Sequence, residues 1–192
     1  MRKLVQALVA VCMLVLSAQV VFAASEKETI QEGADLSSVH RLAIALPEYY
    51  PTGEKPATKE EVVEAIAAAS KVARCYVLSY DDAAYAIRSA GGPDIKVLDR
   101  RKAVSEFKAG IGKHADAYVV MTVANNSGIV CFFDVYRAGT NDLLYTYQVG
   151  ASRFAKNTPD TFKALSEQFF KKFESSAETQ QKKEAREARK KK

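Results

Sequence analysis

The chain has few of the residues that most enzyme active sites require. Its 192 residues include no Trp, and the only imidazole bases are His40 and His114. Neither stands in a motif typical of a hydrolase nucleophile, and no group of His, Cys or carboxylates has the spacing of metal ligands. The nine glycines form no glycine-rich phosphate loop. The sequence therefore predicts no catalytic residue, no metal and no cofactor.

Long apolar runs are missing after residue 24, so no later segment is expected to cross a membrane. The amino terminus is different, because Arg2 and Lys3 precede an almost wholly apolar run that ends in small residues at Ala23 and Ala24. This pattern is typical of a cleaved secretory signal peptide. We therefore expect residues 1–24 to be removed and the mature protein to lie in the periplasm or on the cell surface.

Two alternatives to cleavage stay open. The apolar run approaches the roughly 20 residues that span a bilayer, so it would also serve as an uncleaved anchor. A lipoprotein signal would use Cys12, but Val11 precedes it where a small residue is expected. Cleavage is favoured over both.

A strong charge of either sign is missing from the body of the chain. Residues 25–176 carry 19 basic and 20 acidic residues, so they favour no nucleic-acid-binding face. Residues 177–192 hold seven Lys or Arg, three Glu and no aliphatic residue beyond Ala. Such a segment cannot bury a core, and we expect a disordered tail or a frayed helical extension. Two roles stay open for this segment: it only keeps the protein soluble, or it also makes a weak contact with anionic lipid or polymer. Salt would weaken such a contact.

Cysteine is also scarce. After cleavage only Cys75 and Cys131 remain, and an even number in an exported chain permits one disulfide. Both lie in apolar, strand-like segments, where free thiols are commonly buried. The sequence leaves a bridge and two free thiols as open alternatives.

Regular elements follow a polar leader, residues 25–38. Helix signals include a capping box at Thr58 and Glu61, a cap at Asp99, and Pro159 at the first position of the last helix. Strands are expected at 42–46, 75–80, 117–123, 129–137 and 142–149, and helices at 58–73, 81–90, 100–112 and from 158 onward.

This order predicts a single α/β domain at residues 39–176. Strands alternate with helices in the first part, which is typical of parallel pairing, whereas the last two strands form a hairpin around residues 138–141. We expect a three-layer domain with a mixed sheet of about five strands flanked by helices. The early strands should be parallel and the late hairpin antiparallel.

Several segments between residues 95 and 175 resemble a group of exported bacterial domains. They are Asp99-Arg100 at a helix start, the step from His114 to Tyr118 into a strand, Asp134-Val135-Tyr136, and the turn from Gly139 to Tyr145. The group includes the curli-secretion lipoprotein CsgG, the amino-terminal domain of TolB, and the penicillin-binding-protein activator LpoB. The resemblance implies an α/β fold used for assembly or recognition, without enzymatic activity. The chain has no recognisable pore-forming insertion and has His114 where the group has Gly, so a curli-type channel is not expected.

Ligands of open α/β sheets bind beyond the carboxyl ends of parallel strands. Three pairs of residues follow those ends: Tyr49 and Tyr50, Asp81 and Asp82, and Asn125 and Asn126. The tyrosines, in a loop rich in Pro and Gly, suit the role of interface anchors. Alternatively, the tyrosines pack onto the domain, and the aspartates begin the next helix. Asp116 is expected to satisfy backbone groups at the entry to a strand.

These patterns predict a non-catalytic binding or assembly module of the cell envelope. Its partner would be an envelope protein or a wall component, and the sequence predicts neither an oligomeric state nor a specific ligand. Two alternatives remain: a hydrolase of wall or surface polymer, and a structural or stress-related surface protein.

Overall fold

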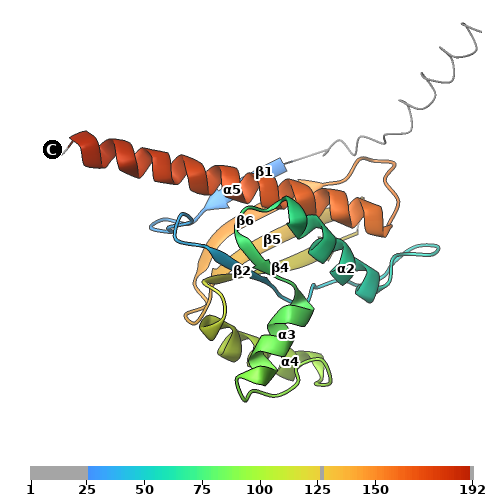
Figure 1. Cartoon of the computed structure of the whole chain (residues 1–192). Coiled ribbons are helices and arrows are strands. Elements are labelled where there is room, and N and C mark those ends of the chain that lie inside the picture. Colours follow the sequence, from blue (N-terminus) through green and yellow to red (C-terminus); the bar gives the residue numbers. More distant parts are fainter. Residues whose placement is uncertain (1–25, 126–127, 191–192) are drawn as a thin grey trace, which may run out of the picture.

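A six-stranded mixed sheet forms the centre of the molecule, and helices cover both of its faces (Figure 1). The computed structural model describes residues 26–125 and 128–190. The predicted signal peptide, residues 1–24, and Asn126 lie outside the described residues. The three-layer α/β architecture expected from the sequence is confirmed, with six strands instead of about five.

The strands lie in the order β1-β6-β5-β4-β2-β3 across the sheet. As predicted, the early strands pair in parallel and the late strands pair antiparallel. Strand β2 lies between β3 and β4. Their bounds are β1 Glu26–Ile30, β2 Arg41–Ile44, β3 Tyr76–Leu78, β4 Ala117–Ala124, β5 Val130–Arg137 and β6 Leu143–Gly150.

Strand β1 corrects the expected start of the domain at residue 39. It lies inside the polar leader and pairs antiparallel with β6 at the edge of the sheet. All five of its residues are exposed, and four of the five are polar in the sequence EKETI. The apolar alternation that would predict a strand is therefore missing. The Glu28 carboxylate accepts hydrogen bonds from the hydroxyls of Tyr145 (3.1 Å) and Ser176 (2.8 Å). Backbone pairing and these contacts hold the strand in place.

Helices α2 and α4 begin where the local signals place them. Thr58 and Glu61 form the predicted capping box of α2 (Lys59–Ala69), and Asp99 caps α4 (Arg100–Gly110). Helix α3 (Tyr80–Ser89) begins one residue earlier than expected, because Ser79 is its cap. Short 3-10 turns follow α2 and α4 at Ser70–Val72 and Ile111–Lys113.

Helices α2 and α5 (Pro159–Lys190) cover one face of the sheet and enclose the larger core. Phe169 of α5 stacks on Phe133 of β5 with ring centroids 4.5 Å apart, and Phe173 meets Tyr145 edge-on at 5.5 Å. All four rings are almost fully buried. Burying one such ring contributes about 1.5–3 kcal/mol, so this face supplies a large part of the folding free energy.

Helices α3 and α4 cover the opposite face, but only over the parallel half of the sheet (Figure 1). Their smaller core takes residues from β2, β3 and β4 and reaches β5 only at Tyr136. The two helices together are far shorter than α2 and α5, and the sheet beside them is half-exposed at Val120, Thr122 and Asp134. This incomplete cover sets the position of the functional site described below.

The segment expected to be a tail continues α5 as a helix up to Lys190. The last buried residue of α5 is Ser176, and residues 181–190 are exposed throughout. Of the two alternatives left by the sequence, the described part of this segment is the helical extension. Across residues 26–125 and 128–190, no helix is both long and apolar enough to cross a bilayer.

Cys75 and Cys131, the two cysteines in the described part of the chain, are free thiols, so the disulfide alternative is not realised. Cys131 lies on β5 in the larger core, and Cys75 is half-buried just before β3. Burial, with the nearby Glu174 carboxylate, raises the pKa of Cys75 to about 11, and burial raises that of Cys131 to about 12. Both thiols therefore stay protonated at neutral pH, which makes them weak nucleophiles.

Candidate functional site

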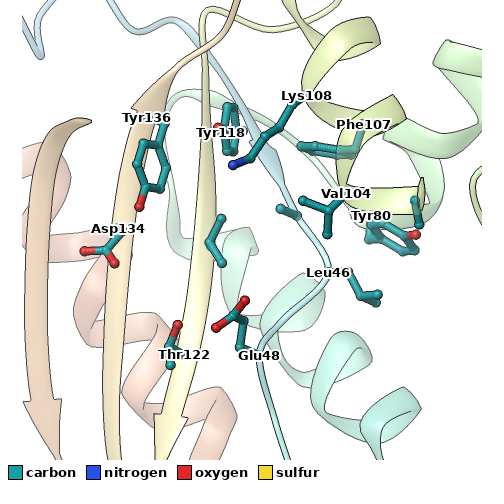
Figure 2. A pocket seen from close by; sticks show the side chains of 13 residues that line it. Leu46, Glu48, Tyr80, Val104, Phe107, Lys108, Tyr118, Thr122, Asp134 and Tyr136 are labelled. Carbon is teal, nitrogen blue, oxygen red and sulfur yellow. The ribbon is translucent and has the colours of Figure 1, made fainter. Parts of the chain in front are cut away.

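A pocket lies between α4 and the sheet, near the carboxyl end of β2 (Figure 2). It has a volume of about 210 Å³, and we call it the α4 pocket. The chain segment after β2 runs beside β4, where Glu48 pairs with Thr122 in a parallel bridge. The lining residues are Ala45, Leu46, Glu48, Tyr80, Ala103, Val104, Phe107, Lys108, Tyr118, Val120, Thr122, Asp134 and Tyr136.

Aromatic rings form much of the wall of the α4 pocket. Tyr118 of β4 stacks on Tyr136 of β5 at 5.3 Å and meets Phe107 of α4 edge-on at 5.6 Å. Phe107 in turn stacks on Tyr80 at 6.4 Å. Tyr118 is fully buried and its hydroxyl donates to Oδ1 of Asn141 (2.8 Å), so this wall is held rigidly.

Two carboxylates stand on the sheet side of the pocket (Figure 2). Glu48 pairs with Arg100 of α4 (3.3 Å), and Asp134 accepts a hydrogen bond from the hydroxyl of Thr146 (2.8 Å). Burial raises the pKa of Tyr136, and the negative charges of Asp134 and Glu48 raise it further. The field of both carboxylates therefore reaches the Tyr136 hydroxyl.

A lysine reaches into the same space from the helix. Figure 2 shows Lys108 of α4 extending toward the rings of Tyr118 and Tyr136. Its ammonium nitrogen lies 5.9 Å from the centre of the Tyr136 ring, within the range of a cation–π contact. Among residues 26–125 and 128–190, no carboxylate forms an ion pair with Lys108.

A second cleft of about 480 Å³, lined by more charged side chains, adjoins the α4 pocket and shares Leu46, Tyr80 and Ala103 with it. This cleft lies at the edge predicted from the sequence, and Asp81 lines it. The Asp81 carboxylate pairs with the ammonium of Lys96 (2.7 Å), and both side chains are more than half exposed. Asp81 therefore belongs to a solvated ion pair at the rim of the site.

Of the two alternatives that the sequence left open for the tyrosine pair, packing onto the domain holds for Tyr49 and exposure holds for Tyr50. Tyr49 is only 2% exposed, packs edge-on against Phe162 at 5.3 Å, and donates its hydroxyl proton to the carbonyl of Ala57 (2.8 Å). Tyr50 is 71% exposed. Two consecutive residues in extended chain point to opposite sides, so only one of them faces solvent. Tyr49 is a core residue, and a binding role for Tyr50 stays a prediction.

Asp82 and Asn125 are not part of the α4 pocket lining. Asp82 completes a capping box, because its Oδ2 accepts hydrogen bonds from the backbone N–H (3.3 Å) and hydroxyl (2.7 Å) of Ser79. Asn125 follows β4, and its buried Oδ1 has no hydrogen-bond partner among the described residues. Asn126 lies outside the described residues. Their roles in binding stay predictions.

Asp116 satisfies backbone groups at the entry to β4, as expected. Its Oδ2 accepts from the backbone N–H groups of His40 (3.0 Å) and Arg41 (2.8 Å), and the Arg41 side chain pairs with it at 3.5 Å. Partial burial opposes its charge, but the hydrogen bonds and Arg41 outweigh burial, so the pKa of Asp116 lies below its ordinary value. This carboxylate joins β2 to β4 at the end of the sheet opposite the pocket.

Sequence reasoning missed most of the α4 pocket. The residues that define it, Glu48, Lys108, Asp134 and Tyr136, come from a loop, a helix and a strand of the late hairpin. The one available signal was Asp134, because a charge in the middle of the apolar segment IVCFFDVYR marks a side chain that does not face the core.

Comparison with known proteins finds likeness of overall fold. No protein-family model and no curated protein matches the chain. The LpoB C-terminal domain from Escherichia coli is 13% identical in sequence to this chain, with a TM-score of 0.45. The match covers 64% of this chain and 87% of the LpoB domain. A PelC dodecamer structure from Paraburkholderia phytofirmans is 8% identical, with a TM-score of 0.40. That match covers 75% of this chain and 92% of the PelC chain. The sequence predicted a resemblance to a group that includes LpoB, and the likeness to its other members CsgG and TolB stays a prediction.

Proposed function

We propose that this protein is an exported binding module of the cell envelope and that the α4 pocket is its ligand site. The observation that carries the proposal is the pocket itself, which joins rigid aromatic walls to a few polar groups. Such a combination is typical of binding sites in α/β domains. Its place near the carboxyl end of β2 agrees with the general rule for open α/β sheets.

The size of the pocket limits what enters it. Sites for drug-sized ligands and cofactors usually occupy about 300–1,000 Å³, whereas the α4 pocket measures about 210 Å³. We infer that it receives one residue-sized group, such as a side chain of a partner protein or one unit of a wall polymer. The neighbouring cleft, with its solvated Asp81–Lys96 pair, would contact the rest of that partner.

A blocking substitution tests this assignment. Val104 lines the pocket and is half-buried, so Val104→Trp should fill the pocket without changing any charge. Ser105, the next residue of α4, is exposed and is not part of the lining, so Ser105→Trp is the matched control. We expect the first variant, but not the second, to lose capture of an envelope component by the immobilised protein. Equal capture by both variants would contradict the proposal.

Export is the second part of the proposal, and the amino-terminal pattern of Arg2, Lys3 and the following apolar run supports it. Amino-terminal sequencing of the protein from an envelope fraction should find a chain that begins just after Ala23 or Ala24. A chain that still begins at Met1, or at a lipidated Cys12, would contradict cleavage at this site.

A polymer hydrolase is the second candidate, because the two carboxylates Glu48 and Asp134 line one pocket, and glycoside hydrolases use paired carboxylates. Both carboxylates already interact with groups of the protein, Arg100 and Thr146, which favours fixed charges for binding. Turnover of wall fragments that Glu48→Gln abolishes would favour the enzyme. A protein with neither partner nor turnover would be a structural or stress-related surface protein.

The exposed end of α5 supports a further, weaker contact with anionic lipid or polymer. Residues 181–190 are exposed and carry five basic and two acidic side chains. Such a contact rests on charge alone, so salt should weaken it strongly. Co-sedimentation with anionic and neutral vesicles at low and high salt measures it, and salt-independent binding would contradict this mechanism.

A further inference from the structure

The Lys108 ammonium shows which chemistry the α4 pocket accepts. It sits 5.9 Å from the centre of the Tyr136 ring, without an ion-pair partner among the described residues. A positive charge over an aromatic face is attracted by the electron-rich ring, and the attraction grows when water is excluded. The protein itself therefore places an alkylammonium group in this pocket, at the end of a flexible stem.

The fixed charges around the pocket favour the same kind of group. Glu48 and Asp134 both line the pocket, and Figure 2 shows the Glu48 carboxylate beside Thr122. Arg100 pairs with Glu48 from outside the lining. Among the lining residues are thus two carboxylates and one cation, and that cation is at the end of a flexible lysine stem. If Lys108 swings out, the pocket keeps its aromatic wall, the Asp134 carboxylate and the Glu48 carboxylate, which stays paired with Arg100.

We propose that the α4 pocket binds an organic ammonium group, which displaces Lys108 from its place over Tyr136. This inference rests on the proposed function, since it names the ligand class of that binding site. Lys108 then acts as an internal competitor, because the pocket is free only in the fraction of molecules whose lysine has moved away. An anionic ligand would require the opposite role for Lys108, that of a direct partner.

Two sources would supply such a group in an envelope: the side chain of a partner's lysine, and the amine of an amino sugar or diamino acid in a wall polymer. Both fit a pocket of about 210 Å³, and both carry the ammonium on a residue-sized unit. N-α-acetyl-lysine methylamide stands for the first source and glucosamine for the second. N-acetylglucosamine, in which the amine is neutralised, and acetate serve as controls.

Titration of the isotope-labelled protein with these four compounds, followed by backbone amide shifts in β4 and β5, measures their affinities. We expect at least one amine to bind with a dissociation constant on the order of 1 mM, as for a single group in an open site. N-acetylglucosamine and acetate should cause no saturable shifts at the pocket. Tighter binding of the lysine derivative would identify a protein partner, and tighter binding of glucosamine a wall polymer.

The sharper test is whether replacing Lys108 raises or lowers the affinity for the amine. Lys108→Met removes the competitor while keeping a chain of similar length, so amine affinity should rise about threefold to tenfold. Tyr136→Leu should lower amine affinity about fivefold, whereas Tyr136→Phe, which keeps the ring, should leave it nearly unchanged. Lys108 and Tyr136 are both half-exposed, and thermal melts of the variants show whether each one is folded.

Loss of amine binding in Lys108→Met would overturn the inference, and so would binding of acetate through Lys108. Absence of amine binding in both the unchanged protein and Lys108→Met would overturn it as well. If Val104→Trp nevertheless abolishes capture of an envelope component, the α4 pocket is still the binding site, but its ligand belongs to a different chemical class. If Val104→Trp has no effect on capture either, both proposals fail.

Discussion

The two faces of the sheet are covered in different ways. Helices α2 and α5 close one face over a continuous core, in which Phe169 and Phe133 stack at 4.5 Å. The shorter pair α3 and α4 leaves an opening on the other face, where Tyr136 and Asp134 reach the surface. A long helix that buries every ring it contacts contributes stability, whereas an incomplete cover leaves sheet side chains available to a ligand.

The largest contrast should come from deleting one aromatic ring on each face. Phe169→Ala removes a fully buried ring and leaves a cavity, so it should lower the free energy of unfolding by about 3–5 kcal/mol. Tyr136→Leu, at the half-exposed wall of the pocket, should lower it by about 1 kcal/mol. Denaturant unfolding of both variants measures the difference. Equal losses of unfolding free energy in the two variants would contradict a division into one stabilising face and one ligand-binding face.

Both faces depend on the alignment of β2 with β4, and Asp116 holds that alignment. Asp116→Asn should lower the free energy of unfolding by about 2 kcal/mol at neutral pH, because the charged hydrogen bonds to His40 and Arg41 weaken. The pKa of Asp116 is lowered in the folded protein, so its stabilisation is present above the ordinary value of 3.8 and is lost as the pH falls through the folded value.

The difference between Asp116→Asn and the unchanged protein should therefore shrink below about pH 3.8, and unfolding curves over a range of pH measure it. Glu54→Gln, in the loop before α2, is the control carboxylate and should change little at any pH. A loss in Asp116→Asn that is constant down to pH 2 would argue against the charge as the cause.

The loop after β2 repeats the same contrast between two adjacent residues. Tyr49→Phe removes a buried hydroxyl that lies 2.8 Å from the Ala57 carbonyl and 2.9 Å from Oδ1 of Asn157, and should cost about 1 kcal/mol. Tyr50→Phe changes an exposed hydroxyl and should cost almost nothing. Thermal melts compare the two variants. A larger loss for Tyr50→Phe would contradict the orientation of this loop.

The smallest effect is expected at the end of the closed face, where α5 extends beyond the core. Removal of residues 182–192 leaves Gln180 in place, which bonds to the backbone of Leu36 (3.0 Å) and Ala34 (2.7 Å). The free energy of unfolding should change by less than about 0.5 kcal/mol, since the removed described residues are all exposed. A larger loss in denaturant unfolding would show that this segment contributes to the core.

Local signals in the sequence determined the helix starts and most strands. The hydrogen bonds of a capping box, as in Thr58 and Glu61, join residues three positions apart, so they are visible in the sequence alone. In α5, Phe162, Leu165 and Phe169 follow helical spacing in the sequence, and all three side chains are buried in the core. These preferences depend on near neighbours only.

Only the tertiary structure decided the edge strand, the orientation of the tyrosines and the pocket. Strand β1 has no apolar pattern and is held by its pairing with β6, far away in the sequence. Tyr49 enters the core because Phe162 and Asn157 lie opposite it. The α4 pocket is lined by side chains from α4, β4, β5 and the segment after β2, and its Lys108 ammonium lies 5.9 Å from the centre of the Tyr136 ring. Contacts between distant segments depend on how the layers pack, and no local preference encodes that packing.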